Sequence, residues 1–151
     1  CAAGGSQILL NSLGYHFPLD QVLGQAVTLK IKAETNEWSN WPGVLVYEGI
    51  NVIPQVNNEL LIGATLEPGY FCNNIALQKM IQLNDSNPEW LQKGVVKSQW
   101  KGIRFKPNNE PAPLLKTLEP GLILNTAHYR NGILLAPACA EWVEKEIKAN
   151  Y

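Results

Sequence analysis

The chain has 151 residues, a net charge of -1, 46% hydrophobic residues and 17% charged residues. A chain of this length can form one domain that buries roughly 70% of its unfolded surface. The near-neutral charge lacks the basic excess that binding to nucleic-acid phosphates requires, so we expect no nucleic-acid partner. No run reaches the roughly 20 apolar residues of a membrane span, so we expect no such span.

The three cysteines, Cys1, Cys72 and Cys139, have no C-x-x-C spacing and no neighbouring histidines. This pattern favours neither a disulfide framework nor a metal site, and it suits a cytoplasmic protein with reduced thiols. The chain opens with Cys-Ala-Ala-Gly-Gly-Ser, without a methionine or a signal-peptide core. We interpret this start as an interior cut in a longer protein.

The first half of the sequence predicts one short helix followed by strands. The helix runs from Ser6 to Ser12 and ends at Gly14. A strand over Val22–Ile31 and a loop over Asn36–Gly43 follow. Three β-rich runs come next, and Asn57-Asn58 between the last two favours a tight hairpin. These runs are Val44–Tyr47, Ile50–Val56 and Glu59–Thr65.

The second half mixes helices and strands in no βαβ rhythm. The predicted elements are helices over Asn74–Leu83 and Pro88–Lys93, strands over Val95–Phe105 and Leu122–Thr126, and a helix over Asn131–Ala149, with a proline-rich loop containing Pro107, Pro111 and Pro113. The last helix should pack through Leu135, Cys139, Val143 and Ile147. We therefore expect an α+β fold with a predominantly antiparallel sheet and flanking helices, as a single domain over residues 1–151.

The segment Asn125–Ala138 (NTAHYRNGILLAPA) runs from a strand through a turn into a helix. The free amides near Gly132–Leu134 and the positive end of the helix dipole favour a negatively charged ligand. Pro137 cannot donate a hydrogen bond to the carbonyl of Ile133, so a bend after the first turn is expected.

This segment resembles the C-terminal signature of the glycine oxidase and D-amino-acid oxidase family. Three further stretches are similar to that family, in the family's order. They are Gln99–Arg104 (QWKGIR), Ile50–Glu67 with its Gly-Ala-Thr-Leu-Glu end, and Ala2–Ser6. The chain departs from the family's pattern at Gln55, Asn108-Asn109 and Ala127, and it has no tyrosine at Ile50 or Asn51.

The resemblance implies the substrate-binding domain of an FAD-dependent enzyme that oxidises a small amino acid or secondary amine by hydride transfer. It implies substrate contacts by Arg104, Arg130 and Asn51, with no side chain acting as a catalytic base. It implies flavin contacts by Ala3, Gly4, Arg130, Asn131, Gly132, Ile133 and Leu134.

The Gly-x-Gly-x-x-Gly turn that binds the pyrophosphate of FAD is missing. In the family that motif lies in an N-terminal segment, which we expect as the partner of this chain. The 151 residues alone are therefore predicted neither to retain FAD nor to oxidise amines. A stand-alone carboxylate-binding module and a purely structural or interaction domain remain alternatives.

Single residues also have more ordinary interpretations. Arg130 could be a surface charge, Arg104 could form a structural ion pair with a carboxylate such as Glu110, and His128 suits a hydrogen-bonding role in a turn better than catalysis. The amine substrate, the electron acceptor and the oligomeric state are not determined by the sequence.

Overall fold

The computed structural model describes residues 6–32, 41 and 43–150, and these fall into two compact units. Unit 1 comprises residues 1–22 and 103–151, and unit 2 comprises residues 23–102. Strands β1 (Leu19–Lys30) and β6 (Val95–Pro107) have residues in both. Each unit is described by itself below.

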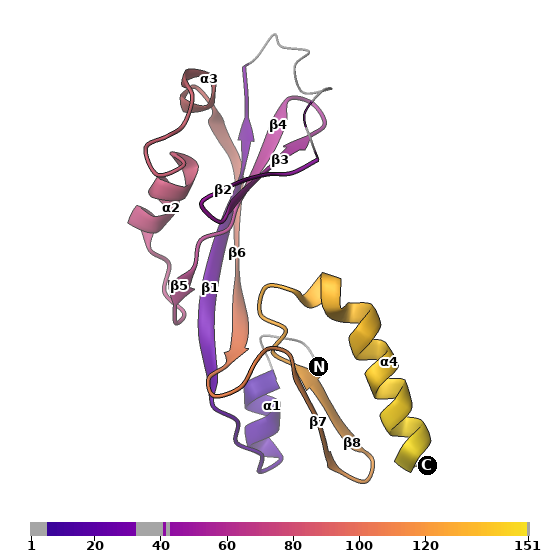
Figure 1. The fold of residues 1–151 in the computed structure, drawn as a ribbon. Coiled ribbons are helices and arrows are strands. Elements are labelled where there is room, and N and C mark those ends of the chain that lie inside the picture. The colour runs from indigo at the N-terminus through magenta and orange to yellow at the C-terminus, as the bar shows by residue number, and fades with distance from the viewer. Residues whose placement is uncertain (1–5, 33–40, 42, 151) are drawn as a thin grey trace. The chain divides into compact units, whose positions relative to one another are not determined.

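Unit 2 is built on an antiparallel sheet (Figure 1). Its strand order is β2-β3-β4-β1-β5, and β6 also pairs with β1. The further elements are β2 (Leu45–Tyr47), β3 (Ile50–Gln55), β4 (Glu59–Gly63), β5 (Glu67–Pro68), α2 (Asn74–Ile81) and α3 (Glu89–Gln92). The predicted hairpin is confirmed, because Gln55 pairs with Glu59 and both Asn57 and Asn58 have positive φ.

The core of unit 2 lies between the sheet and its two helices. Strand residues of alternating position, such as Leu29, Val52 and Ile62, pack with Leu77 of α2 and Leu91 of α3. Strand side chains alternate between the two faces of a sheet, so these residues mark the face that the helices cover. The predicted α+β class and the predominance of antiparallel pairing are confirmed.

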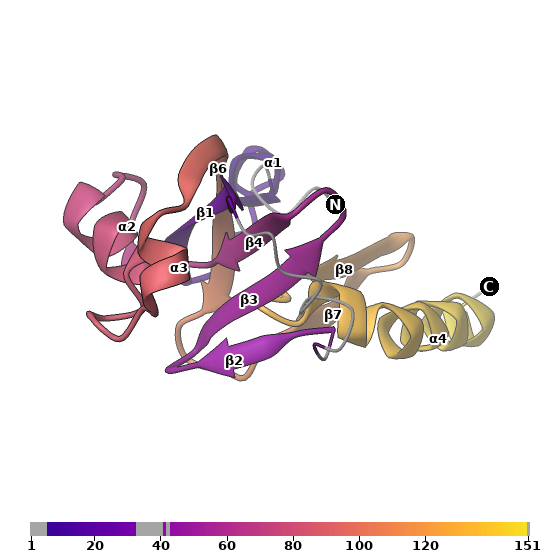
Figure 2. The same cartoon turned by 90° about the horizontal axis from the view of Figure 1, so that it is seen from above.

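Unit 1 contains the remaining elements (Figure 2). These are α1 (Ser6–Ser12), the hairpin of β7 (Leu114–Glu119) and β8 (Leu122–Thr126), and α4 (Gly132–Asn150). Its core joins Leu10 of α1 and Phe105 of β6 to Leu114 and Leu124 of the hairpin. As predicted, Gly14 ends α1, with a φ of +83°.

Two features of unit 1 differ from what the sequence predicted. Strand β7 was not predicted, because its alternation is interrupted by a register shift between Thr117 and Glu119. Ile147 was expected to pack, but it is 47% exposed. The neighbouring Glu146 faces the hairpin instead, where it accepts a hydrogen bond from Thr117. The predicted packing of Cys139 is confirmed, since that side chain is buried.

Among the residues that the structure describes, no helix combines the length and apolar character that crossing a bilayer requires. Within the same ranges, no group of three or more His, Cys, Asp or Glu residues is placed to hold a metal ion.

Candidate functional site

The predicted strand-to-helix junction is present in unit 1. Strand β8 ends at Thr126, and the turn that follows contains two residues with positive φ, Ala127 at 53° and Tyr129 at 55°. The turn closes with a hydrogen bond from the Asn131 amide to the His128 carbonyl, and α4 begins at Gly132. The helix continues through Pro137, whose missing N–H leaves one carbonyl of the first turn without its helical donor.

The first turn of α4 exposes both amides and apolar side chains. The first backbone amide with a helical hydrogen bond is that of Leu135, which donates to the Asn131 carbonyl at 2.9 Å. The preceding amides are those that a helix leaves without an intrahelical acceptor. Ile133 is 95% exposed and Leu134 is 81% exposed. The junction therefore combines amide donors, the positive end of a dipole and an apolar surface.

Arg104 and Arg130 both belong to unit 1 and influence each other electrostatically. Arg104 lies on β6 and is half-buried, while Arg130 is exposed in the turn before α4. Burial lowers the pKa of Arg104, the positive charge of Arg130 lowers it further, and Tyr129 acts in the opposite direction. Two guanidinium groups within one unit can bind a carboxylate through several charge-assisted hydrogen bonds when both reach it.

The other predicted contact residues belong to unit 2 or lie outside the described residues. Asn51 lies on β3 of unit 2, opposite Gly63 of β4 and Val46 of β2. Its convergence with the two arginines on one ligand stays a prediction. Ala3 and Gly4 lie outside the described residues.

A buried polar network in unit 2 was missed by the sequence reasoning. The Glu67 carboxylate, only 4% exposed, accepts hydrogen bonds from the Thr65 hydroxyl, the Gln25 side-chain amide at 2.9 Å and the Asn73 backbone amide. Gln99 in turn donates to the Gln25 side chain at 2.9 Å. The only sequence signal was the Gly-Ala-Thr-Leu-Glu match, which contains Thr65 and Glu67 but neither Gln25 nor Asn73.

Hydrogen bonding decides the ionisation of Glu67. Burial alone raises the pKa of this carboxyl group. The hydrogen bonds from Thr65, Gln25 and the Asn73 amide act in the opposite direction and leave the pKa below its usual value of 4.5. Glu67 is thus an ionised, internally satisfied group that anchors the segment before α2, and it has no free oxygen to offer a ligand.

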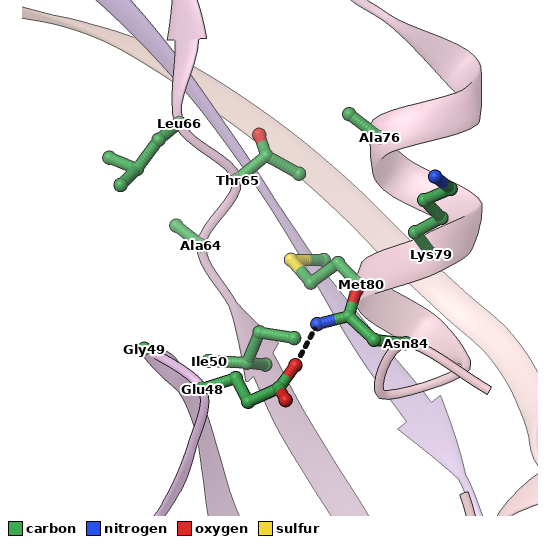
Figure 3. Close-up of a pocket in the computed structure, with 10 residues that line it drawn as sticks. All are labelled: Glu48, Gly49, Ile50, Ala64, Thr65, Leu66, Ala76, Lys79, Met80 and Asn84. Atoms are coloured by element: carbon green, nitrogen blue, oxygen red, sulfur yellow. Dashed lines mark hydrogen bonds between the residues drawn. The ribbon is translucent and has the colours of Figure 1, made fainter. Parts of the chain in front are cut away.

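A pocket of about 270 Å³ in unit 2 was also not predicted (Figure 3). It is lined by the β2–β3 turn, by residues 64–66 and by α2. Its charged residues, Glu48 and Lys79, have the sequence pattern of ordinary surface positions, so the sequence alone gives no signal for the pocket.

The comparisons with known proteins agree on one family. The family model described as FAD dependent oxidoreductase (DAO) matches residues 1–145. Glycine oxidase from Pseudomonas putida is 30% identical over 145 residues, and glycine oxidase from Pseudomonas aeruginosa is 34% identical over 143 residues. The matches cover 93% and 91% of this chain and 38% of each relative, so the chain spans well under half of their length.

Solved structures of the same type share the fold. Glycine oxidase from Bacillus cereus superposes with a TM-score of 0.75 at 24% identity, covering 97% of this chain and 40% of that one. Iminodiacetate oxidase from Chelativorans gives a TM-score of 0.75 at 19% identity, covering 93% of this chain and 39% of that one. With the family model matching nearly the whole length, the chain belongs to the DAO family of FAD-dependent oxidoreductases.

Proposed function

We propose that this chain is the substrate-binding and flavin-facing part of an FAD-dependent oxidoreductase that oxidises a small amino acid or secondary amine. The carrying observation is that Arg104 and Arg130 belong to one unit, where the charge of Arg130 helps to lower the pKa of Arg104, and that Arg130 directly precedes the start of α4. Glycine and iminodiacetate, named in the relatives, both carry a carboxylate close to the amine nitrogen. A substrate of this class needs a cationic anchor for that carboxylate.

In this proposal the two arginines hold the substrate carboxylate and thereby orient the carbon that bears the amine. Their guanidinium groups suit this role because they keep their charge and bind carboxylates through two parallel hydrogen bonds. Asn51 is proposed as a third substrate contact from the sheet. The anchoring fixes the position of the reacting carbon, which contributes to catalysis through proximity and orientation.

The start of α4 fits one face of a flavin ring. The exposed side chains of Ile133 and Leu134 offer an apolar surface, and the amides of residues 131–134 favour negative charge beside it. FAD, when bound, supplies the two-electron acceptor to which the substrate hydrogen is transferred as hydride. Exclusion of water by the apolar side chains strengthens the electrostatic contacts around the reacting groups.

The substrate role is tested by Arg130→Ala in the complete protein that contains this chain. We expect the KM for the amine substrate to rise by roughly 10 to 100-fold, with a smaller fall in kcat, because a charge-assisted anchor is removed. Lys145→Ala on the exposed part of α4 is the matched control and should leave both constants unchanged. Unchanged kinetics in Arg130→Ala would remove this residue from the site.

The cofactor role is tested on the 151-residue chain. A helix terminus contributes about 0.3 to 2 kcal/mol, whereas micromolar affinity requires about 8 kcal/mol. We therefore expect a colourless protein without saturable quenching of FAD fluorescence below about 1 mM. A yellow preparation with stoichiometric flavin contradicts this expectation. A cytoplasmic location and dependence on a separate FAD-binding segment remain part of the proposal.

A further inference from the structure

The pocket in unit 2 is formed by residues to which the proposed oxidation assigns no role (Figure 3). It has a volume of about 270 Å³, close to the lower end of the range for small-molecule sites of about 300 to 1,000 Å³. Three segments far apart in the sequence line it: residues 48–50, residues 64–66, and α2 with the turn that follows. Any binding at this pocket is therefore a property of the folded unit.

The floor of the pocket is apolar. Ile50 and Met80 are 7% and 3% exposed, and the side chains of Ala64, Leu66 and Ala76 complete the lining. Small residues at positions 64 and 76 leave the space that the larger side chains border. An aliphatic group of a ligand would be removed from water on this floor, at roughly 25 cal/mol per Å² of apolar surface.

A carboxylate is held in a fixed position at one side of the pocket. The Asn84 side-chain amide donates a 2.6 Å hydrogen bond to Oε2 of Glu48, as Figure 3 shows. The same hairpin is tied to the loop after α2 by a second bond, from the Tyr47 hydroxyl to Ser86 Oγ at 2.9 Å. The two bonds restrict the β2–β3 turn, so Glu48 is oriented before any ligand arrives.

An ammonium group lines the same pocket from α2. Lys79 belongs to the lining, and Figure 3 shows it on α2, on the other side of the pocket from Glu48 of the β2–β3 turn. Among the described residues, neither Glu48 nor Lys79 takes part in an ion pair. The pocket thus presents opposite charges that do not neutralise each other, above a floor that is apolar.

We propose that this pocket binds an aliphatic amino acid as a zwitterion. The ligand's ammonium group pairs with Glu48, its carboxylate pairs with Lys79, and its side chain lies against Met80 and Ile50. A simple amine leaves Lys79 without a counter-charge and brings two cations together. A simple carboxylate leaves Glu48 without a counter-charge and brings two anions together. Only a ligand with both charges complements both residues.

The sequence contains a single methionine, Met80, which gives the pocket its own spectroscopic probe. The 151-residue chain labelled with ¹³C in the methionine methyl group therefore shows one methyl signal from inside the site. We propose titrating it with leucine and with two matched probes, 3-methylbutylamine, which lacks the carboxylate, and 4-methylpentanoate, which lacks the ammonium group. We expect a saturable shift with leucine at a Kd of about 1 mM, and binding at least about fivefold weaker for either probe.

Variants test the two charges separately. Glu48→Gln and Lys79→Gln should each weaken leucine binding about fivefold or more. Lys93→Gln, an exposed lysine of the same unit outside the pocket, should bind leucine like the unmodified chain. The probe series on the unmodified chain still decides the question if a variant does not fold.

Three results would overturn the proposal. They are a methyl signal that does not move up to about 50 mM leucine, equal binding of leucine and its matched probes, and retention of affinity in both charge variants. None of these depends on flavin or on amine oxidation, so failure of this proposal is distinguishable from failure of the proposed function.

Discussion

Replacing Glu67 with glutamine should destabilise unit 2 through a single buried hydrogen bond. The substitution keeps the shape of the side chain but turns one acceptor oxygen into a donor that faces the Thr65, Gln25 or Asn73 donor. A hydrogen bond to a charged group contributes about 1.5 to 3 kcal/mol, and a buried donor left without a partner costs a similar amount. We expect the free energy of unfolding to fall by about 2 to 3 kcal/mol at pH 7.

The effect should depend on pH in a defined direction. Because the folded-state pKa of Glu67 is lowered below 4.5, its contribution is complete above about 4.5 and is lost as the pH falls through the folded-state value. Glutamine does not titrate, so the difference between Glu67→Gln and the unmodified chain should shrink below pH 4.5. Urea unfolding followed by circular dichroism at pH 7 and at about pH 3 measures both quantities.

A matched control separates this network from surface electrostatics. Glu89 pairs with Lys93 on α3, where the two side chains are 81% and 68% exposed. Glu89→Gln should change the free energy of unfolding by less than about 1 kcal/mol. The reasoning is refuted if Glu67→Gln behaves like this control, or if its effect is the same at both pH values.

Two further substitutions follow from local geometry. Asn73 caps α2, since its Oδ1 accepts hydrogen bonds from the amides of Ile75 and Ala76 at 2.9 and 3.2 Å. Asn73→Ala should lower the free energy of unfolding in urea by about 1 kcal/mol. An effect no larger than that of Asn74→Ala would contradict this. A Cβ at Gly63 would lie 2.9 Å from the Ala26 Cβ, so Gly63→Ala should cost about 1 to 3 kcal/mol. Adding Ala26→Gly should recover part of that loss, and no recovery would show that this contact is not the cause.

Local signals account for the parts of the fold that were predicted well. The hairpin at Asn57-Asn58 and strand β8 over Leu122–Thr126 are found where turn residues and apolar runs placed them. Strand β5 has only two residues and pairs with a distant partner, Leu23 opposite Glu67, whereas strand β7 pairs with its neighbour β8 across a register shift between Thr117 and Glu119. Such pairing leaves no periodic pattern in the short strand itself, which explains why those elements were missed.

The candidate functional residues were likewise predicted only in part. Arg104 and Arg130 are 26 positions apart, and only their family-like motifs marked them as a pair; the structure places both in unit 1, where the charge of Arg130 lowers the pKa of Arg104. Glu48 and Asn84 are separated by 36 residues and occupy unremarkable surface sequence. A pocket assembled from such positions becomes visible only when the hairpin and the loop after α2 are placed in space.

The Gly-Ala-Thr-Leu-Glu stretch shows why a motif match does not by itself reveal a role. Gly63 permits close contact with Ala26, and Thr65 and Glu67 form a satisfied internal network. Each of these residues is used in packing or in hydrogen bonds within unit 2, with Glu67 directing a carboxylate oxygen to the amide of Asn73 just before α2. The stretch therefore fixes the junction between β4 and α2 through packing and hydrogen bonds within unit 2.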